Sequence, residues 1–498
     1  MSEFKRQHPI AAVSRVLSLI RENLITIIIL LFIGTSRTQG YFIYFLLGGL
    51  AIALIGGVFG WWVFKYRVYE EELQIKKGIF VKNQLYLSKD RIQVIDITEG
   101  ILQRMFGLVK VEVKTAGGGT ETATISAITR EEAEALRTEL RKRKNGKEQE
   151  LQEESEAVAQ NQEEEVEVLD SWKLSTRDLV FAAFTSSNFG VIASILGAVS
   201  GQLDEFINEE TVRYVYDMAP GYSNVTVIVG LVVAIIVISW LLSFLGVIFK
   251  YSDFRLQKTK KELIITSGLL ERKHITVPFN RIQAVRYVEG VIRQPLGYGM
   301  LYVESAGFNQ SDKGRSIVLV PYLAASRITE FLGDFLDDYS MPELNVTPPK
   351  RAKWRYIRRI NYAMLVIVPL LWWLLDYGWL SILAVPILSW LGWLRYRDAA
   401  YGVSEELIHL RYRTISRTTA VVKRRRVQNV ELSENPFQKN KQLNTLKVTV
   451  ASGAGGMGFE IEDLDSGQAH QVLQWLMEGK ATLTSADTEI EEGVPQQD

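Results

Sequence analysis

Cysteine is absent from this chain of 498 residues, and histidine is scarce. The lack of cysteine excludes disulfide bonds, thiolate metal ligands and cysteine nucleophiles. No two histidines have the spacing of metal ligands; the four are His8, His274, His409 and His470. The sequence therefore predicts neither a metal site nor thiol chemistry.

Catalytic motifs are also missing. There is no phosphate-binding loop, no G-x-S-x-G nucleophile turn and no H-E-x-x-H zinc motif. Two glycine-rich stretches, AGGG from Ala116 and GAGG from Gly453, follow predicted strands without opening a helix, so we interpret them as hairpin turns. We predict that the protein is not an enzyme, with no catalytic residues and no cofactor.

The 57 basic and 57 acidic residues cancel, so net charge identifies no partner. Long apolar runs are more informative, because roughly 20 mostly apolar residues cross the hydrocarbon core of a membrane. Tyr41–Phe64 and Val225–Phe249 meet this requirement. Weaker runs complete three pairs: Val16–Gly34, Leu179–Gly201, Ile360–Leu375 and Trp379–Leu394. The sequence thus predicts a polytopic α-helical membrane protein with six spans.

The distribution of lysine and arginine predicts the orientation of these spans. The loops Thr35–Gly40 and Gln202–Asn224 each contain a single arginine, and the turn of the third pair contains no basic residue. Basic residues flank the opposite ends, as at Lys65, Lys250 and Arg395. Since basic loops remain inside, we expect a multi-pass protein of the bacterial plasma membrane with both termini cytoplasmic.

A threefold internal repeat follows the helix pairs. Each copy has a segment that begins with RIQ or RVQ, carries glutamate eight residues later and alanine 25 residues after its start. The repeat-defining residues are Arg91 and Glu99, Arg281 and Glu289, and Arg426 and Glu434. Either these are functional pairs, or they form structural ion pairs or strand-edge hydrogen bonds; their recurrence favours a structural role.

The three segments, the preceding helix pairs and the opening His8-Pro9-Ile10 resemble the bacterial pleckstrin-homology-like (PH-like) family of membrane-flanked domains. The resemblance implies three cytoplasmic β-rich PH-like domains, each closed by a C-terminal helix. It implies no catalytic activity, and it suggests a link to tolerance of membrane-active antimicrobial peptides.

Together, these patterns divide the chain into ten segments. The predicted segments are an N-terminus (1–15), helix pair 1 (16–64), PH-like domain 1 (65–142), an acidic linker (143–175), helix pair 2 (176–249), PH-like domain 2 (250–340), a basic linker (341–357), helix pair 3 (358–394), PH-like domain 3 (395–480) and an acidic tail (481–498).

Two basic clusters are candidate contacts for lipid or protein partners. They contain Arg351, Lys353, Arg355, Arg358 and Arg359 next to the third helix pair, and Arg424 and Arg425 in the third domain. Basic residues beside a span attract anionic lipid, but they also set topology. In the third domain they also suit a solvated, charge-protected strand edge.

We therefore predict a non-catalytic, membrane-anchored interaction protein of the bacterial envelope. Its PH-like domains would bind partner proteins, each other or inner-leaflet lipid, but not nucleic acid. The alternative is a transporter or exporter component. The near absence of charged residues from the spans argues against that alternative, because ion and proton pathways usually need intramembrane ionisable groups.

Overall fold

The computed structural model describes residues 3–22, 41–70, 72–78, 81–89, 92–115, 122–141, 167–186, 224–305, 316–341, 343–374, 378–452 and 456–477. The chain forms two compact units, Met1–Thr276 and Val277–Asp498. The boundary lies inside the predicted second PH-like domain, 250–340. The predicted domain limits themselves stay a prediction.

Unit 1 begins with two helices and the first repeat. The helices are α1 (Ile10–Glu22) and α3 (Tyr41–Val63). The strands and shorter helices that follow are β1 (Lys65–Tyr69), β2 (Glu72–Lys77), β3 (Asn83–Ser88), β4 (Ile92–Glu99), α4 (Ile101–Met105), β5 (Leu108–Thr115), β6 (Thr122–Thr129) and α5 (Arg130–Arg141). Strands β1 to β3 form one antiparallel sheet, while β4 to β6 belong to a larger one.

The two sheets and α5 share one hydrophobic core, which includes Leu73, Ile95, Val111 and Leu136. Helix α5 starts at a capping box, as its Thr-x-x-Glu pattern predicts. The Thr129 hydroxyl accepts from the amide of Glu132 at 3.2 Å, and Glu132 accepts from the amide of Thr129 at 3.4 Å. The first repeat is therefore a two-sheet domain closed by a C-terminal helix.

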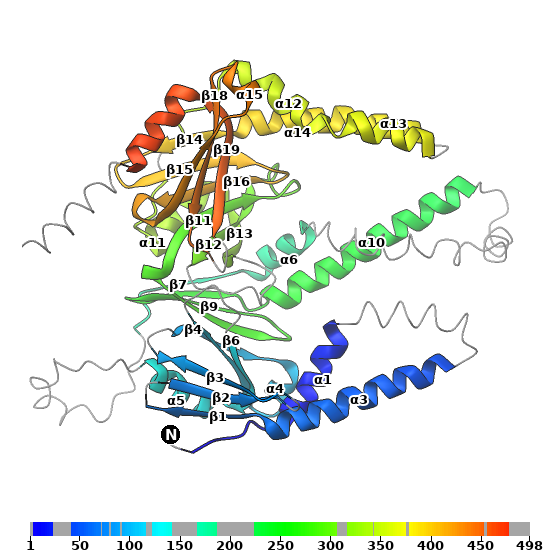
Figure 1. The fold of residues 1–498 in the computed structure, drawn as a ribbon, viewed down its shortest axis with the longest axis vertical. Helices are drawn as coiled ribbons and strands as arrows, with labels where there is room; N and C mark the ends of the chain where they lie inside the picture. Colours follow the sequence, from blue (N-terminus) through cyan, green and yellow to red (C-terminus); the bar gives the residue numbers. More distant parts are fainter. Residues whose placement is uncertain are drawn as a thin grey trace, which may run out of the picture. The chain divides into compact units, whose positions relative to one another are not determined.

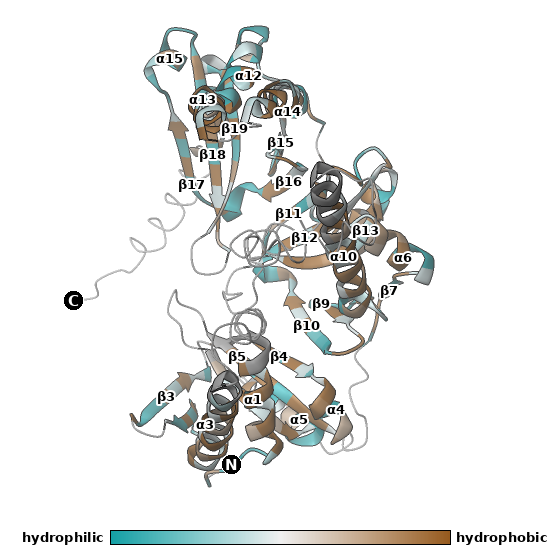
Figure 2. Ribbon diagram, turned by 90° about the vertical axis from the view of Figure 1, so that its right-hand side faces the viewer, coloured by the Kyte–Doolittle hydropathy of each residue, from teal (hydrophilic) through white to brown (hydrophobic). Residues whose placement is uncertain are grey.

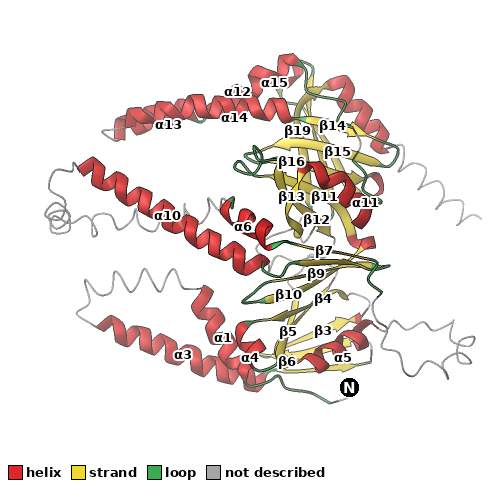
Figure 3. Ribbon diagram, turned by 180° about the vertical axis from the view of Figure 1, so that it is seen from behind, coloured by secondary structure: helices red, strands yellow, loops and turns green. Residues whose placement is uncertain are grey.

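The rest of unit 1 comes from the second repeat. Its elements are β7 (Asp170–Lys173), α6 (Thr176–Phe184), α10 (Asn224–Tyr251), β8 (Arg255–Lys258), β9 (Glu262–Ser267) and β10 (Arg272–Pro278). These strands extend the larger sheet to seven, in the order β6-β5-β4-β10-β9-β8-β7. Helices α3 and α10 leave the strands of unit 1 on the same side (Figures 1 and 3).

Unit 2 starts with the second half of the second repeat. Its elements are η4 (Phe279–Arg281), β11 (Ile282–Glu289), β12 (Tyr298–Ser305), β13 (Ile317–Ala324), η5 (Ala325–Arg327) and α11 (Ile328–Phe335). Then come η6 (Lys350–Ala352), α12 (Lys353–Asn361), α13 (Met364–Leu374), η7 (Gly378–Leu383) and α14 (Ala384–Asp398).

The third repeat completes unit 2. It comprises β14 (Ala400–Val403), β15 (Leu407–Arg413), β16 (Arg417–Lys423), η8 (Arg424–Arg426), β17 (Val427–Ser433), α15 (Pro436–Lys439), β18 (Leu443–Val450), β19 (Met457–Asp465) and a helix over 466–477. The sheets run β13-β12-β11-β16-β15-β14 and β17-β18-β19. Buried residues of β14 to β19 and of the last helix form a common core.

Equivalent turns confirm the repeat in detail. Gly78 after β2 and Gly268 after β9 have φ of 109° and 111°, a region that favours glycine. A Cβ atom would lie 1.9 Å from the carbonyl oxygen of Val81 at the first turn, and 2.0 Å from that of Glu271 at the second. Any side chain at either glycine would therefore clash with the backbone.

Among the described residues, two helical stretches are long and apolar enough to cross a membrane: Lys350–Leu374 and Gly378–Asp398. They correspond to the third predicted pair, so the described part of the chain has two candidate spans rather than six. Leu47–Val63 and Ile236–Tyr251 are shorter apolar helices that overlap the two strongest predicted runs. Val16–Gly34 and Leu179–Gly201 lie largely outside the described residues.

The apolar helices leave large hydrophobic side chains uncovered. Ile52 in α3 is 73% exposed, and Leu365 and Trp373 in α13 are 73% and 82% exposed. Figure 2 shows α3 and α13 as largely hydrophobic. Soluble monomers rarely expose contiguous apolar surface of this kind, so these helices suit a lipid environment.

Candidate membrane and partner interface

The basic cluster beside the third helix pair extends from η6 into α12. Its side chains therefore point to two different sides of the helix. Arg351, Arg355 and Arg359 recur every four residues and therefore share one side of the helix. A second set of residues, each next to or one turn along from the first, forms another side of the helix. This set contains Lys350, Trp354, Arg358 and Tyr362. The two sides have different environments.

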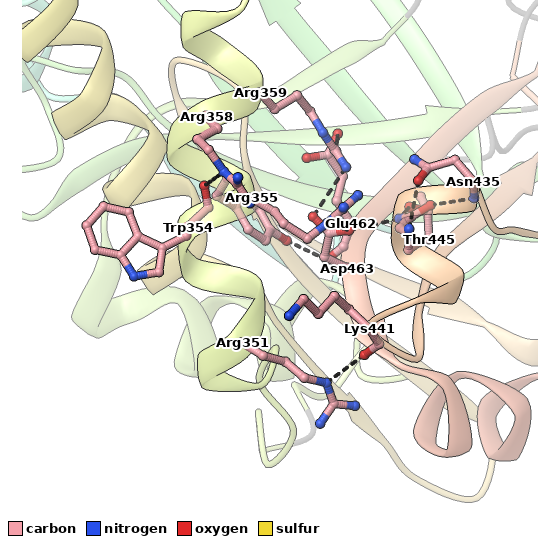
Figure 4. A network of polar contacts seen from close by, with 12 residues as sticks. Arg351, Trp354, Arg355, Arg358, Arg359, Asn435, Lys441, Thr445, Glu462 and Asp463 are labelled. Atoms are coloured by element: carbon pink, nitrogen blue, oxygen red, sulfur yellow. Dashed lines mark hydrogen bonds and ion pairs between the residues drawn. The ribbon is translucent and has the colours of Figure 1, made fainter.

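The first side is paired with carboxylates of β19, and we call it the paired face. Arg351 forms an ion pair with Asp465. The Nε atom of Arg355 lies 3.0 Å from Oδ1 of Asp463. Arg359 contacts both Glu462 and Oδ2 of Asp463, the latter at 3.2 Å. Figure 4 shows Arg355 and Arg359 converging on Glu462 and Asp463, and Arg351 donating to the carbonyl of Lys441.

Asp463 is the centre of this network. Its side chain is fully buried and accepts from Arg355, from Arg359 and from the side-chain amide of Gln438 at 2.8 Å. A buried carboxylate is costly unless it is paired and hydrogen-bonded, and here it has three donors. Nearby, the hydroxyl of Tyr356 donates to the carbonyl of Glu462. The paired face therefore attaches α12 to its own domain.

The second side, Lys350, Trp354, Arg358 and Tyr362, is open to solvent, and with the adjacent Lys353 we call it the open face. Trp354 is 66% exposed and Tyr362 is 59% exposed. In Figure 4, Trp354 points away from the β19 carboxylates. The Nε atom of Arg358 donates to the carbonyl of Trp354 at 3.3 Å, within the helix. The open face forms the N-terminal half of the candidate span Lys350–Leu374.

The second predicted cluster also divides. The guanidinium of Arg424 lies over the ring of Trp475, 4.8 Å from its centroid, so it contacts the closing helix of its own domain. Arg425 is exposed and lines an open depression with Asp338, Glu405 and Lys423. Of this pair, Arg425 is the residue that an external ligand would reach.

In the two copies for which the structure describes both residues, the repeat-defining arginine and glutamate do not form an ion pair. Arg281 and Arg426 end the equivalent turns η4 and η8, ahead of β11 and β17. The glutamates lie at the other ends of these strands, and Arg91 lies outside the described residues. Two of the glutamates, Glu99 and Glu289, instead lie opposite residues of the following repeat.

Two antiparallel strand pairs join successive repeats, and we call them repeat joints. In the first, β10 pairs with β4, and Arg272 lies opposite Glu99. In the second, β16 pairs with β11, and Arg417 lies opposite Glu289. Both arginines stand nine residues before an RIQ or RVQ arginine. The two joints therefore have the same register.

The second joint contains a buried charge network. Both nitrogen–oxygen contacts between Arg417 and Glu289 are 2.6 Å, and these hydrogen bonds raise the pKa of Arg417. Asp398 accepts from Arg413 at 2.5 Å and lies 3.9 Å from Arg417. In the first joint the equivalent carboxylate is that of Asp253, which lies two residues before β8 as Asp398 lies two residues before β14. Asp253 is 3.2 Å from Arg272.

Comparison with known proteins agrees with this architecture. The sequence matches the family described as Bacterial PH domain over residues 13–144, 206–335 and 358–480. The chain belongs to the bacterial PH domain family. Each match combines at least part of an apolar helix pair with the strands that follow it. The resemblance to membrane-flanked PH-like domains is thus confirmed, in three copies.

Two Bacillus subtilis (strain 168) proteins are similar to this bacterial PH domain chain. Transmembrane protein YdbT is 32% identical over 97% of this chain and 99% of its own length. Transmembrane protein YdbS is 33% identical over 78 residues, which are 16% of this chain and 47% of YdbS. The extent of the first match indicates a membrane-associated protein.

Proposed function

We propose that this bacterial PH domain protein is a non-catalytic, multi-pass anchor of the cell envelope. Its cytoplasmic PH-like domains bind partner proteins or anionic lipid of the inner leaflet. The observation that carries the lipid part is the open face of α12, with basic and aromatic residues at the N-terminal end of a candidate span. The six-span topology with cytoplasmic termini is supported by the distribution of lysine and arginine.

The open face has the chemistry of an interfacial segment. Tryptophan and tyrosine gather at membrane–water boundaries, and basic residues near the surface gain about 1 kcal/mol each from anionic lipid. Lys353, Trp354 and Arg358 supply both kinds of group. The paired face contributes less, because the charges of Arg355 and Arg359 are compensated by Asp463 and Glu462.

Lipid retention provides the test. The variant Lys353→Gln/Arg358→Gln removes two charges from the open face, and Lys439→Gln/Lys441→Gln removes two exposed charges at and after α15 as a matched control. Full-length proteins are purified in mild detergent with added phosphatidylglycerol, and bound lipid is counted by native mass spectrometry. We expect the first variant to bind the lipid about thirtyfold more weakly, since two charges contribute about 2 kcal/mol, and the control to be unchanged. Equal retention in both variants would contradict the lipid part.

The envelope role extends to tolerance of membrane-active antimicrobial peptides, a proposal supported by the family resemblance. A deletion strain should become more sensitive to cationic or pore-forming peptides, and the wild-type chain should restore tolerance. Unchanged peptide sensitivity and envelope integrity after deletion would count against this role.

A further inference from the structure

The first and the last repeat each have a strand edge that no other described strand pairs with. In the described part of the chain, β3 pairs only with β2, and β17 pairs only with β18. Strand β3 corresponds to β10 and β16, which each pair with the preceding repeat. Strand β17 corresponds to β4 and β11, which each pair with the following repeat. The first and last repeats thus each keep half of a joint.

Burial shows what β17 lacks relative to β11. In β11, Gln283 is 6% exposed, Ala284 is fully buried and Glu289 is 2% exposed. Their equivalents Gln428, Asn429 and Glu434 are all exposed. Two further residues of β17, Val430 and Leu432, pack on the domain core but remain partly exposed. An added strand would cover this edge as β16 covers β11.

The charges at the two edges are complementary. A basic residue stands nine positions before each repeat arginine: Lys82, Arg272 and Arg417. The last two lie opposite Glu99 and Glu289 in the joints. Lys82 beside β3 and Glu434 beside β17 are both exposed. In the joint register, a β3 laid against β17 brings Lys82 opposite Glu434 and Asn83 opposite Ser433.

We infer that β17 of one chain pairs with β3 of a second copy, forming a third joint between molecules. The occupant is this chain itself because its own β3 supplies the strand, the register and the opposite charge. Exposed edge strands are ready templates for such pairing. The contact is head-to-tail, so it builds rings or open chains. This inference rests on the proposed interaction role, and it identifies a second copy of the chain as the partner of the β3 and β17 edges.

The joint is also compatible with membrane anchoring. In unit 1, the helices on both sides of the β4–β10 joint, α3 and α10, leave the strands on the same side (Figure 1). A joint of the same register between two chains would therefore place their helices on one side as well. Both chains can then insert into one membrane.

Cysteine cross-linking tests the joint, since the chain has no native cysteine. Full-length Asn83→Cys and Ser433→Cys chains with different tags are co-expressed, and the membranes are oxidised. Opposite residues of paired strands have Cα atoms about 4.5–5.5 Å apart, within disulfide range. We expect a disulfide-linked dimer that carries both tags. The mismatched pair Asn83→Cys with Asn429→Cys is offset by about 13 Å and should not cross-link.

Each single-cysteine chain expressed alone provides a further discrimination. A dimer of Ser433→Cys chains alone would indicate a twofold β17–β17 contact and overturn the inference. Absence of the mixed dimer would also overturn it, whether the edge is empty or another PH-like protein occupies it. Phosphatidylglycerol retention is measured on the same preparations, so failure of the joint is distinguished from failure of lipid binding.

Charge reversal tests the register independently. Adding Glu434→Lys to the Ser433→Cys chain, or Lys82→Glu to the Asn83→Cys chain, should lower the cross-linking yield about fivefold. Both residues are exposed, so neither change threatens the fold. Combining the two reversals should restore the yield. Failure of the combination to recover would contradict the pairing of Lys82 with Glu434.

Discussion

Arg417 and Glu289 form a two-pronged ion pair between adjacent strands of successive repeats. Nε and Nη2 of the arginine each lie 2.6 Å from a carboxylate oxygen. The Glu289 side chain is only 3% exposed, so Arg417 takes the place of solvent as its hydrogen-bond partner. The pair lies where β11 of the second repeat and β16 of the third repeat are neighbours in one six-stranded sheet.

Removal of Arg417 should destabilise unit 2. Arg417→Ala leaves Glu289 buried and unpaired, which costs about 3–5 kcal/mol. Arg417→Lys keeps the charge but loses the two-pronged geometry, so an intermediate loss is expected. Chemical unfolding of the purified chain in detergent measures both effects.

A matched control comes from the exposed pair Lys447–Glu431, whose side chains are 45% and 55% exposed. Lys447→Ala should cost less than about 1 kcal/mol, because exposed ion pairs contribute little. If Arg417→Ala proves no more destabilising than Lys447→Ala, the joint network does not stabilise unit 2.

The buried Asp463 gives a second stability prediction. Asp463→Ala removes the acceptor shared by Arg355 and Arg359 and should cost about 3–5 kcal/mol. Asp463→Asn should cost less, because asparagine keeps one acceptor oxygen and tolerates the observed φ of 53°. Protease cleavage between α12 and β19 should be lowest in the wild type, higher in Asp463→Asn and highest in Asp463→Ala. Equal stability of all three proteins would show that the paired face does not hold α12.

The general architecture could be predicted from the sequence because its signals are local or periodic. The RIQ and RVQ segments begin at equivalent places of the repeats, and the glycines Gly78 and Gly268 stand at equivalent turns. The capping box at Thr129 is also present as predicted. Each of these depends on neighbouring residues and fixed spacing.

The joints between repeats were not predicted, because strand partners are set by contacts distant in sequence. Arg417 and Glu289 are 128 positions apart. A usable signal existed in the basic residue nine positions before each repeat arginine. The division of α12 into a paired and an open face was also missed. Only the acidic residues of β19, about 100 positions later, distinguish Arg355 from Arg358.

Acid should weaken unit 1 through His274 in the first joint. Burial lowers the pKa of His274 below its usual 6.5, and its Nδ1 lies 3.0 Å from the hydroxyl of Thr266. The charged groups that act on it are Glu99, Arg272, Arg130 and Glu134. Because the unfolded histidine binds a proton more readily, stability is present above pH 6.5 and falls as pH drops through the lower folded pKa.

The variant His274→Gln should flatten this part of the pH dependence. Unfolding is compared at pH 7.5 and 5.5 in the wild type, in His274→Gln and in the control His470→Gln, whose ring is exposed. The wild type and the control should lose stability between these values, and His274→Gln should lose less. An identical loss in all three proteins would exclude His274 as the origin.

The orientation of the chain in the membrane can be tested with single cysteines in the same cysteine-free background. Cysteines at Ser36, Ser223 and Tyr377 lie in the predicted outer loops and should react with an impermeant thiol reagent in intact cells. Cysteines at Ser88, Asn280 and Ser433 lie in the segments predicted to be cytoplasmic and should react only after the membrane is permeabilised. This difference follows from the basic residues flanking the inner ends of the spans, as at Lys65, Lys250 and Arg395. Reaction of the second set in intact cells would reverse the topology and place the open face of α12 on the outer side, away from the inner-leaflet lipid that it is proposed to bind.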